Sequence, residues 1–116
     1  MNRSWLMDNV SVVENSLPYV ELLENESFED STVSLFGWQQ WCSSYCHYGT
    51  KGKIISGADC YLGSGNCFQN SCLGPYVEFI GQFFWTNPGS NYTITFELAL
   101  TGSGGVRSTM FYADIF

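Results

Sequence analysis

The clearest hydrophobic pattern in the chain is a strict alternation over residues 92–100. The apolar positions of this segment are Tyr92, Ile94, Phe96, Leu98 and Leu100. The residues between them are polar or small, which is the period of two that a half-buried strand requires. We therefore predict a strand that turns these apolar side chains to one side.

The segment before this strand is apolar on both faces. Residues 77–86 are apolar apart from Glu78 and Gln82, and residues 87–91 contain the Pro-Gly pair of a tight turn. The two segments together predict a hairpin over residues 76–100. An alternating strand here places one set of side chains inward, namely Ile80, Gln82 and Phe84. The opposite set forms an apolar stripe that needs a cover, namely Phe79, Phe83 and Trp85.

The remainder of the chain divides by composition. Residues 1–18 are polar and mixed, and we expect a poorly ordered lead-in to a domain that covers residues 19–116. Further extended segments are expected at residues 19–23, 33–41 and 108–116, with minimal strands between long loops at residues 42–74. About seven or eight extended segments predict an all-β fold, a two-sheet antiparallel β-sandwich.

Composition narrows the class of protein. The chain has 116 residues, enough for one domain, with 17% aromatic and only 13% charged residues, which is typical of an extracellular all-β module. Four basic against eleven acidic residues give a net charge of -7. This charge argues against nucleic acid or an anionic membrane as a partner. No apolar run approaches the roughly 18 residues of a spanning helix, so we expect no membrane insertion.

Cysteines and glycosylation sequons indicate the secretory route. The chain has five cysteines and N-x-S/T acceptors that include Asn25 and Asn91. Residues 1–20 lack the apolar stretch of a signal peptide. We therefore expect an extracellular protein that either belongs to a longer secreted product or begins upstream of Met1.

Three segments, in order, carry a resemblance to a known family. They are residues 22–29 followed by Gly37-Trp38, residues 81–84 followed by Pro88-Gly89 and Tyr92, and residues 111–115. This order resembles the opening, central and closing motifs of galactose-binding-like jelly rolls, the fold of many carbohydrate-binding modules. The resemblance covers residues 22–116, and the cysteine-bearing loop resembles that of extracellular, cysteine-containing repeats.

The resemblance also implies a metal. In the family, a glutamate of the opening motif and an aspartate of the closing strand commonly meet at one structural calcium. Carried over to this chain, these are Glu29 and Asp114, with backbone carbonyls from residues 25–27. Two carboxylates brought together would repel unless a hard cation lay between them. The alternative is that both are solvated charges at strand ends.

The cysteine spacing leaves the disulfide pairing open. The candidates are Cys42, Cys46, Cys60, Cys67 and Cys72. Five cysteines cannot all pair within one chain, so one is free or has its partner elsewhere. We expect two local bridges that staple the loop, with Cys42 to Cys46 as one candidate pair. A zinc site built from Cys42, Cys46, His47 and two later cysteines is the alternative, but the chain lacks the paired short spacings that zinc usually takes.

Aromatic residues provide the candidate ligand site. Pyranose rings stack on indole and phenol rings, while amides and carboxylates bond the hydroxyls. The candidate platform consists of Trp41, Tyr45, Tyr48 and Trp85. Trp38, by contrast, follows a glycine of the opening motif and is expected in the core.

Catalysis is not indicated. The single histidine, His47, has no nucleophile motif nearby, and a carboxylate pair of Glu78 and Glu97 matches no motif. The sequence therefore predicts a non-catalytic extracellular recognition module, glycan-binding and tied by calcium. The alternative is a structural or adhesive unit, a homo-oligomer or polymer joined by exposed aromatics and the odd cysteine.

Overall fold

The computed structural model describes residues 4–42, 52–70, 78–101 and 111–115. These residues form strands and a single turn of 3-10 helix, which confirms the all-β prediction. The elements are β1 (Ser4–Glu14), β2 (Gln39–Cys42), β3 (Lys53–Ser56), η1 (Tyr61–Gly63), β4 (Asn66–Gln69), β5 (Glu78–Gly81) and β6 (Tyr92–Thr101). Within the described part of the chain, no helix is long and apolar enough to cross a membrane.

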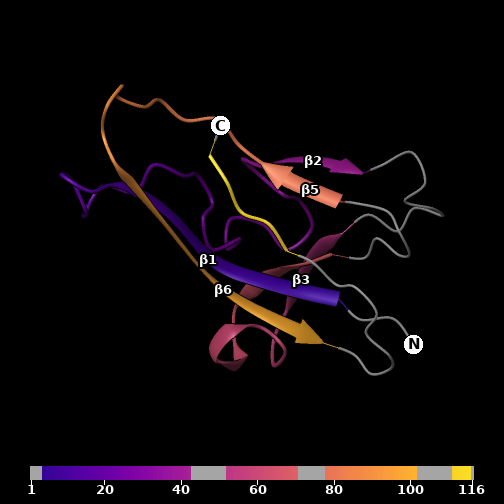
Figure 1. Cartoon of the computed structure of the whole chain (residues 1–116). Helices are drawn as coiled ribbons and strands as arrows, with labels where there is room; N and C mark the ends of the chain where they lie inside the picture. Colours follow the sequence, from indigo (N-terminus) through magenta and orange to yellow (C-terminus); the bar gives the residue numbers. More distant parts are fainter. Residues whose placement is uncertain (1–3, 43–51, 71–77, 102–110, 116) are drawn as a thin grey trace.

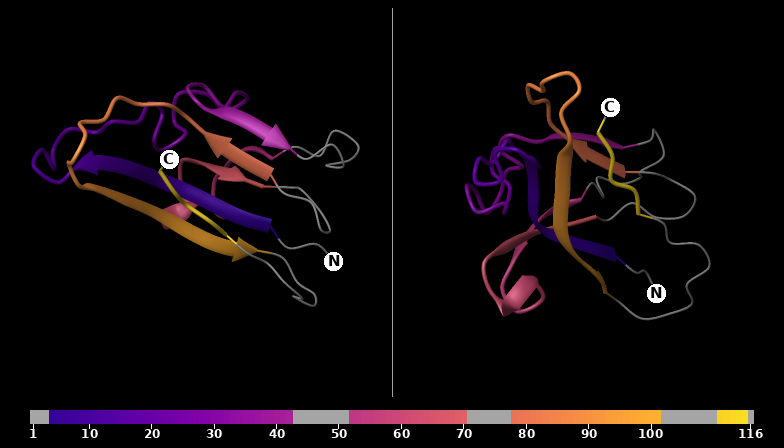
Figure 2. Two further views of the ribbon diagram at one scale, coloured as in Figure 1. Left: turned by 45° about the horizontal axis from the view of Figure 1, so that its top comes forward. Right: turned by 60° about the vertical axis from the view of Figure 1, so that its left-hand side comes forward.

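The strands form two antiparallel sheets, as predicted. The larger sheet has the order β3-β4-β1-β6, and the smaller sheet pairs β2 with β5. Figures 1 and 2 show the long strands β1 and β6 side by side, with the β2–β5 pair in a separate layer. The first and the last strand of the described residues, β1 and β6, are therefore neighbours in the larger sheet.

The core lies between the sheets and the connection from β1 to β2. Its buried members are Met7, Val10, Val12, Leu23, Phe28, Ile54 and Phe68. Phe28 is completely buried, with its ring centroid 5.5 Å from Trp38 and 6.2 Å from Phe68. Trp38 packs against this cluster, as the sequence predicted.

A buried asparagine holds the connection that carries Phe28. The side-chain amide of Asn25 donates to the Phe36 carbonyl (2.8 Å) and its oxygen accepts from the Asp30 amide (3.0 Å). The Asn25 carbonyl accepts from the Trp38 indole at 3.0 Å. These bonds satisfy polar groups of an irregular segment that would otherwise be buried without partners.

The alternation predicted for residues 92–100 is confirmed in β6. Thr93, Thr95, Glu97 and Ala99 are exposed, and the residues between them are partly buried. Of these, Tyr92, Ile94, Phe96 and Leu98 pack against the core. The strand thus presents one apolar face to the core and one polar face to solvent.

The predicted hairpin over residues 76–100 is wrong. The Pro88-Gly89 turn is present, but β6 pairs with β1 and β5 pairs with β2, so the two segments belong to different sheets. β5 has four residues and β6 has ten, whereas β1 has eleven. Among the described strands, only β1 can pair along the whole length of β6, and residues 82–91 cross between the sheets.

The expected lead-in is also wrong, because most of it forms β1 between β4 and β6. A β-bulge between Asp8 and Ser11, with Asn9 at φ 52°, makes this strand difficult to recognise from the sequence. The core-facing residues are Met7 before the bulge, Val10 within it and Val12 after it. The extra residue shifts the phase of the alternation, so no unbroken period of two is visible.

Three further predicted extended segments differ from the structure. Residues 19–23 form no strand, because the Glu21 carboxylate binds the backbone amides that a ladder would use. Of residues 33–41, only the end belongs to a strand, β2. Residues 111–115 join no ladder, although Phe111 packs on Phe96 with ring centroids 5.1 Å apart. Residues 108–110 lie outside the described part.

Within the described part of the chain, a disulfide between Cys60 and Cys67 closes the connection between β3 and β4. Both cysteines are buried with Leu6 in a small cluster on the outer face of the larger sheet. The side chains of the other predicted partners, Cys42, Cys46 and Cys72, lie outside the described residues, as does His47. The stapled-loop prediction is therefore supported for this bridge.

Candidate functional site

The apolar stripe predicted for the segment that includes β5 is exposed. The solvent-accessible fraction is 55% for Phe79, 83% for Phe83 and 96% for Trp85. Ile80 and Phe84 point the other way and pack against the core. The predicted division of this segment into an inward and an outward face is confirmed, and no described residue covers its outward aromatics.

Strand β2 adds a further aromatic to this surface. Trp41 pairs with Phe79 across the two-stranded sheet and is 48% exposed. Its ring lies over Gly81, where an added Cβ would be 3.3 Å from the ring. We call Trp41, Phe79, Phe83 and Trp85 the aromatic face. The other predicted platform residues, Tyr45 and Tyr48, lie outside the described residues.

A groove runs along one end of the aromatic face. It has a volume of about 500 Å³ and is lined by Glu21, Leu22, Glu24, Gly37, Gln39, Gln82, Phe83, Phe84 and Trp85. This volume is within the range of small-molecule sites, and apolar walls with a few polar groups are typical of them. The groove therefore combines rings for stacking with amides and carboxylates for hydrogen bonds.

Gln82 fixes the two walls of the groove to each other. Its side-chain nitrogen donates to the Glu24 carbonyl at 2.9 Å, and its side-chain oxygen accepts from the Glu24 amide at 2.8 Å. The primary amide thus pairs with the backbone in the way that a neighbouring strand would. Phe83 and Trp85 are held beside the segment of Glu21 and Glu24 by this pair of bonds.

The two carboxylates of the groove are positioned differently. Glu21 Oε2 accepts from the backbone amides of Val12, Leu22 and Leu23 at 2.9, 3.1 and 3.2 Å. The Glu24 side chain lies against Gly37, whose φ is +85° and where an added Cβ would be 3.2 Å from Glu24 Cβ. A larger residue at position 37 would be both strained and crowded.

Only negative charge lines this groove. Its charged side chains are Glu21 and Glu24. The only basic side chain among the described residues is Lys53, in β3 of the other sheet. The site therefore carries carboxylates without a neighbouring cation from the described part of the chain.

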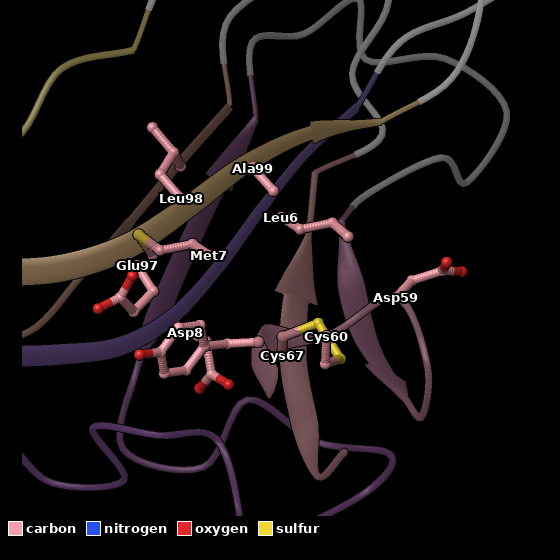
Figure 3. A pocket seen from close by; sticks show the side chains of 10 residues that line it. Leu6, Met7, Asp8, Asp59, Cys60, Cys67, Glu97, Leu98 and Ala99 are labelled. Atoms are coloured by element: carbon pink, nitrogen blue, oxygen red, sulfur yellow. A yellow bond between two sulfur atoms is a disulfide. The ribbon is translucent and has the colours of Figure 1, made fainter. Parts of the chain in front are cut away.

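A second cavity lies near the disulfide, on the outer face of the larger sheet (Figure 3). It has a volume of about 130 Å³, smaller than ordinary ligand pockets. Asp8 and Glu97, opposite each other in the register of β1 and β6, line it together with Asp59 and the disulfide. Burial raises the pKa of Asp8, and the nearby charges of Glu29 and Glu97 raise it further, against the lowering by the Asn9 amide.

The two carboxylates predicted to share calcium have separate partners. Glu29 Oε2 accepts from the Asn66 amide at 2.6 Å, next to Gly65, and Asp114 accepts from the Ile115 amide at 2.8 Å. The carbonyl of Asn25 already accepts hydrogen bonds. Among the described residues, no three or more His, Cys, Asp or Glu side chains are grouped to hold a metal. Calcium at Glu29 and Asp114 stays a prediction.

The two predicted glycosylation acceptors differ in accessibility. The Asn25 amide is buried and donates to the Phe36 carbonyl, whereas Asn91 is exposed beside the Pro88-Gly89 turn. Of the two, Asn91 is the acceptor that a glycan can reach in the folded domain.

The sequence predicted the outward position of Phe79, Phe83 and Trp85. It did not predict the polar wall of the groove, namely Glu21, Glu24, Gln39 and Gln82. The sequence feature that could have indicated this wall is Gln82, a polar residue on the inward side of an apolar segment. Comparison of the chain with models of known families, with curated proteins and with solved structures found no match. The site is therefore interpreted from its own chemistry.

Proposed function

We propose that the chain is a non-catalytic extracellular recognition module that binds glycans at the aromatic face and its groove. We further propose that its two sheets are a variant of the galactose-binding-like jelly roll. The observation that carries the function is the position of Trp85, which is 96% exposed and lines a groove with amides and carboxylates.

Exposure of the Trp85 ring to water is unfavourable. An indole ring in water loses the favourable free energy of burial, about 25 cal/mol for each Å² of apolar surface. The fold does not require Trp85, because Ile80 and Phe84 supply the inward contacts of this segment. A pyranose ring covers an indole with its C–H groups, while Gln39 and Glu24 are placed to bond hydroxyls.

Binding to a glycan array tests the proposal. Wild-type chain should retain at least one glycan, and Trp85→Ala should weaken its binding about tenfold, as expected for a lost stacking contact. Tyr112→Ala is the matched control, because Tyr112 is equally an exposed aromatic but does not line the groove. No retention by the wild-type chain, or equal loss in both variants, would refute the proposal.

Self-association is a second candidate function. Trp41 and Phe79 are paired neighbours on one exposed face, and contiguous apolar surface of this kind often marks a protein interface. Sedimentation over a range of concentrations should then show assembly that Trp41→Ser with Phe79→Ser abolishes. A wild-type chain that stays monomeric at every concentration excludes this candidate.

A further inference from the structure

The groove beside Trp85 has an electrostatic character that goes beyond general glycan binding. Its charged lining consists of the Glu21 and Glu24 carboxylates, and the whole chain has a net charge of -7. Acidic sugars would meet like charge there, whereas a cation would meet opposite charge.

The two glutamates of the groove are held by different contacts. Glu21 is held by backbone amides that bind only its Oε2, and Glu24 is held at its backbone by Gln82. Among the described residues, no donor bonds the Glu24 carboxylate, which lies along Gly37. The Glu24 carboxylate therefore has acceptor capacity for a ligand.

The aromatic side chains of the groove favour the same ligand charge. The faces of Phe83 and Trp85 carry the negative end of the ring quadrupole, which attracts cations, and Trp is the strongest of the aromatic side chains in this respect. Rings and carboxylates in one groove are thus complementary to a ligand that has both an apolar sugar face and a protonated amine.

We infer that the groove selects glycans that carry protonated amino groups, of the glucosamine type, over their neutral and acidic counterparts. This inference rests on the proposed glycan-binding function and specifies its substrate class. The amine would lie between the Glu24 carboxylate and the face of Trp85, with the sugar ring stacked on the indole.

Titration calorimetry with three oligosaccharides of equal length tests the inference. The probes are a glucosamine hexamer, its N-acetylated equivalent and a galacturonic acid hexamer, at about pH 5.5, where amines and most carboxylates are ionised. The wild-type chain should bind the glucosamine oligomer at least about threefold more tightly than the N-acetylated one. This preference should shrink between about 20 and about 150 mM salt, and the acidic oligomer should bind most weakly.

Two carboxylate variants separate the groove from the general charge of the chain. Glu24→Gln should bring the two hexosamine oligomers to nearly equal affinity, and Asp59→Asn, which removes an exposed carboxylate outside this groove, should leave the preference unchanged. Equal affinity of the wild-type chain for both oligomers, or an equal effect of both variants, overturns the inference. If the N-acetylated oligomer still binds and Trp85→Ala weakens it, the proposed function survives that failure. If Trp85→Ala changes no glycan affinity, the proposed function fails as well.

Discussion

The two sheets of this protein differ in where they place their apolar side chains. In the larger sheet, β6 turns Thr93, Thr95 and Glu97 outward and its apolar residues inward. In the smaller sheet, β2 and β5 turn Trp41 and Phe79 outward. The larger sheet follows the ordinary division into apolar core and polar surface, while the smaller sheet has apolar side chains on both faces.

This difference indicates that the two sheets have different roles in the protein. Long antiparallel pairing between β1 and β6 and a buried disulfide cluster give the larger sheet its order. The smaller sheet has four-residue strands and places its aromatics where they contribute little to folding. We therefore interpret the larger sheet as the scaffold, and the aromatic face with its groove as the proposed binding surface.

The largest expected effect contrasts a core aromatic with a surface aromatic. Phe28→Ala should lower the free energy of unfolding by about 3–5 kcal/mol, because it leaves a cavity beside Trp38 and Phe68. Trp85→Ala should change it by less than about 0.5 kcal/mol. Urea denaturation of both variants measures the difference, and a comparable loss in the two would break the distinction between scaffold and binding surface.

A smaller effect is expected for the disulfide. The bridge joins residues that are seven positions apart, and replacing both cysteines by alanine should lower the free energy of unfolding by roughly 2–3 kcal/mol. Neither cysteine lines the groove, so the folded variant should keep the glycan affinity of the wild-type chain. Thermal melts and glycan titration of Cys60→Ala with Cys67→Ala check both statements. Lost affinity in a variant that is fully folded would show that the two sheets are coupled.

The smallest effect concerns the buried carboxyl of the larger sheet. Burial, with Glu29 and Glu97, raises the pKa of Asp8 above its ordinary value of 3.8. The folded state therefore holds this proton more tightly, and the stability that it contributes is complete below pH 3.8 and is lost as pH rises through the folded-state pKa. Asp8→Asn should be more stable than the wild-type chain at neutral pH, and this difference in stability should decrease toward pH 3.8. Melting temperatures measured across this range test the sign, and a less stable variant at neutral pH would contradict it.

Much of the local structure followed from the residue pattern. The alternation of β6, the outward stripe that ends at Trp85 and the core position of Trp38 were all predictable, because each depends on the side chains of one short segment. Strand β1 was not predictable in this way, because the bulge at Asn9 adds one residue and so reverses the face of every residue after it. The Glu21 side chain similarly replaced a predicted strand by local hydrogen bonds.

The sequence by itself determined the all-β class, the acidity of the chain and which aromatics of the β5 segment point away from the core. These are local or additive properties, so neighbouring residues suffice to specify them. Only the tertiary structure decided that β6 pairs with β1, and that Gln82 bonds the backbone of Glu24, which brings the segment of Trp85 beside that of Glu24. Such contacts join segments that are far apart in the sequence. Which segments pair depends on the alternatives that the rest of the chain offers, so the residues of one segment cannot specify the pairing.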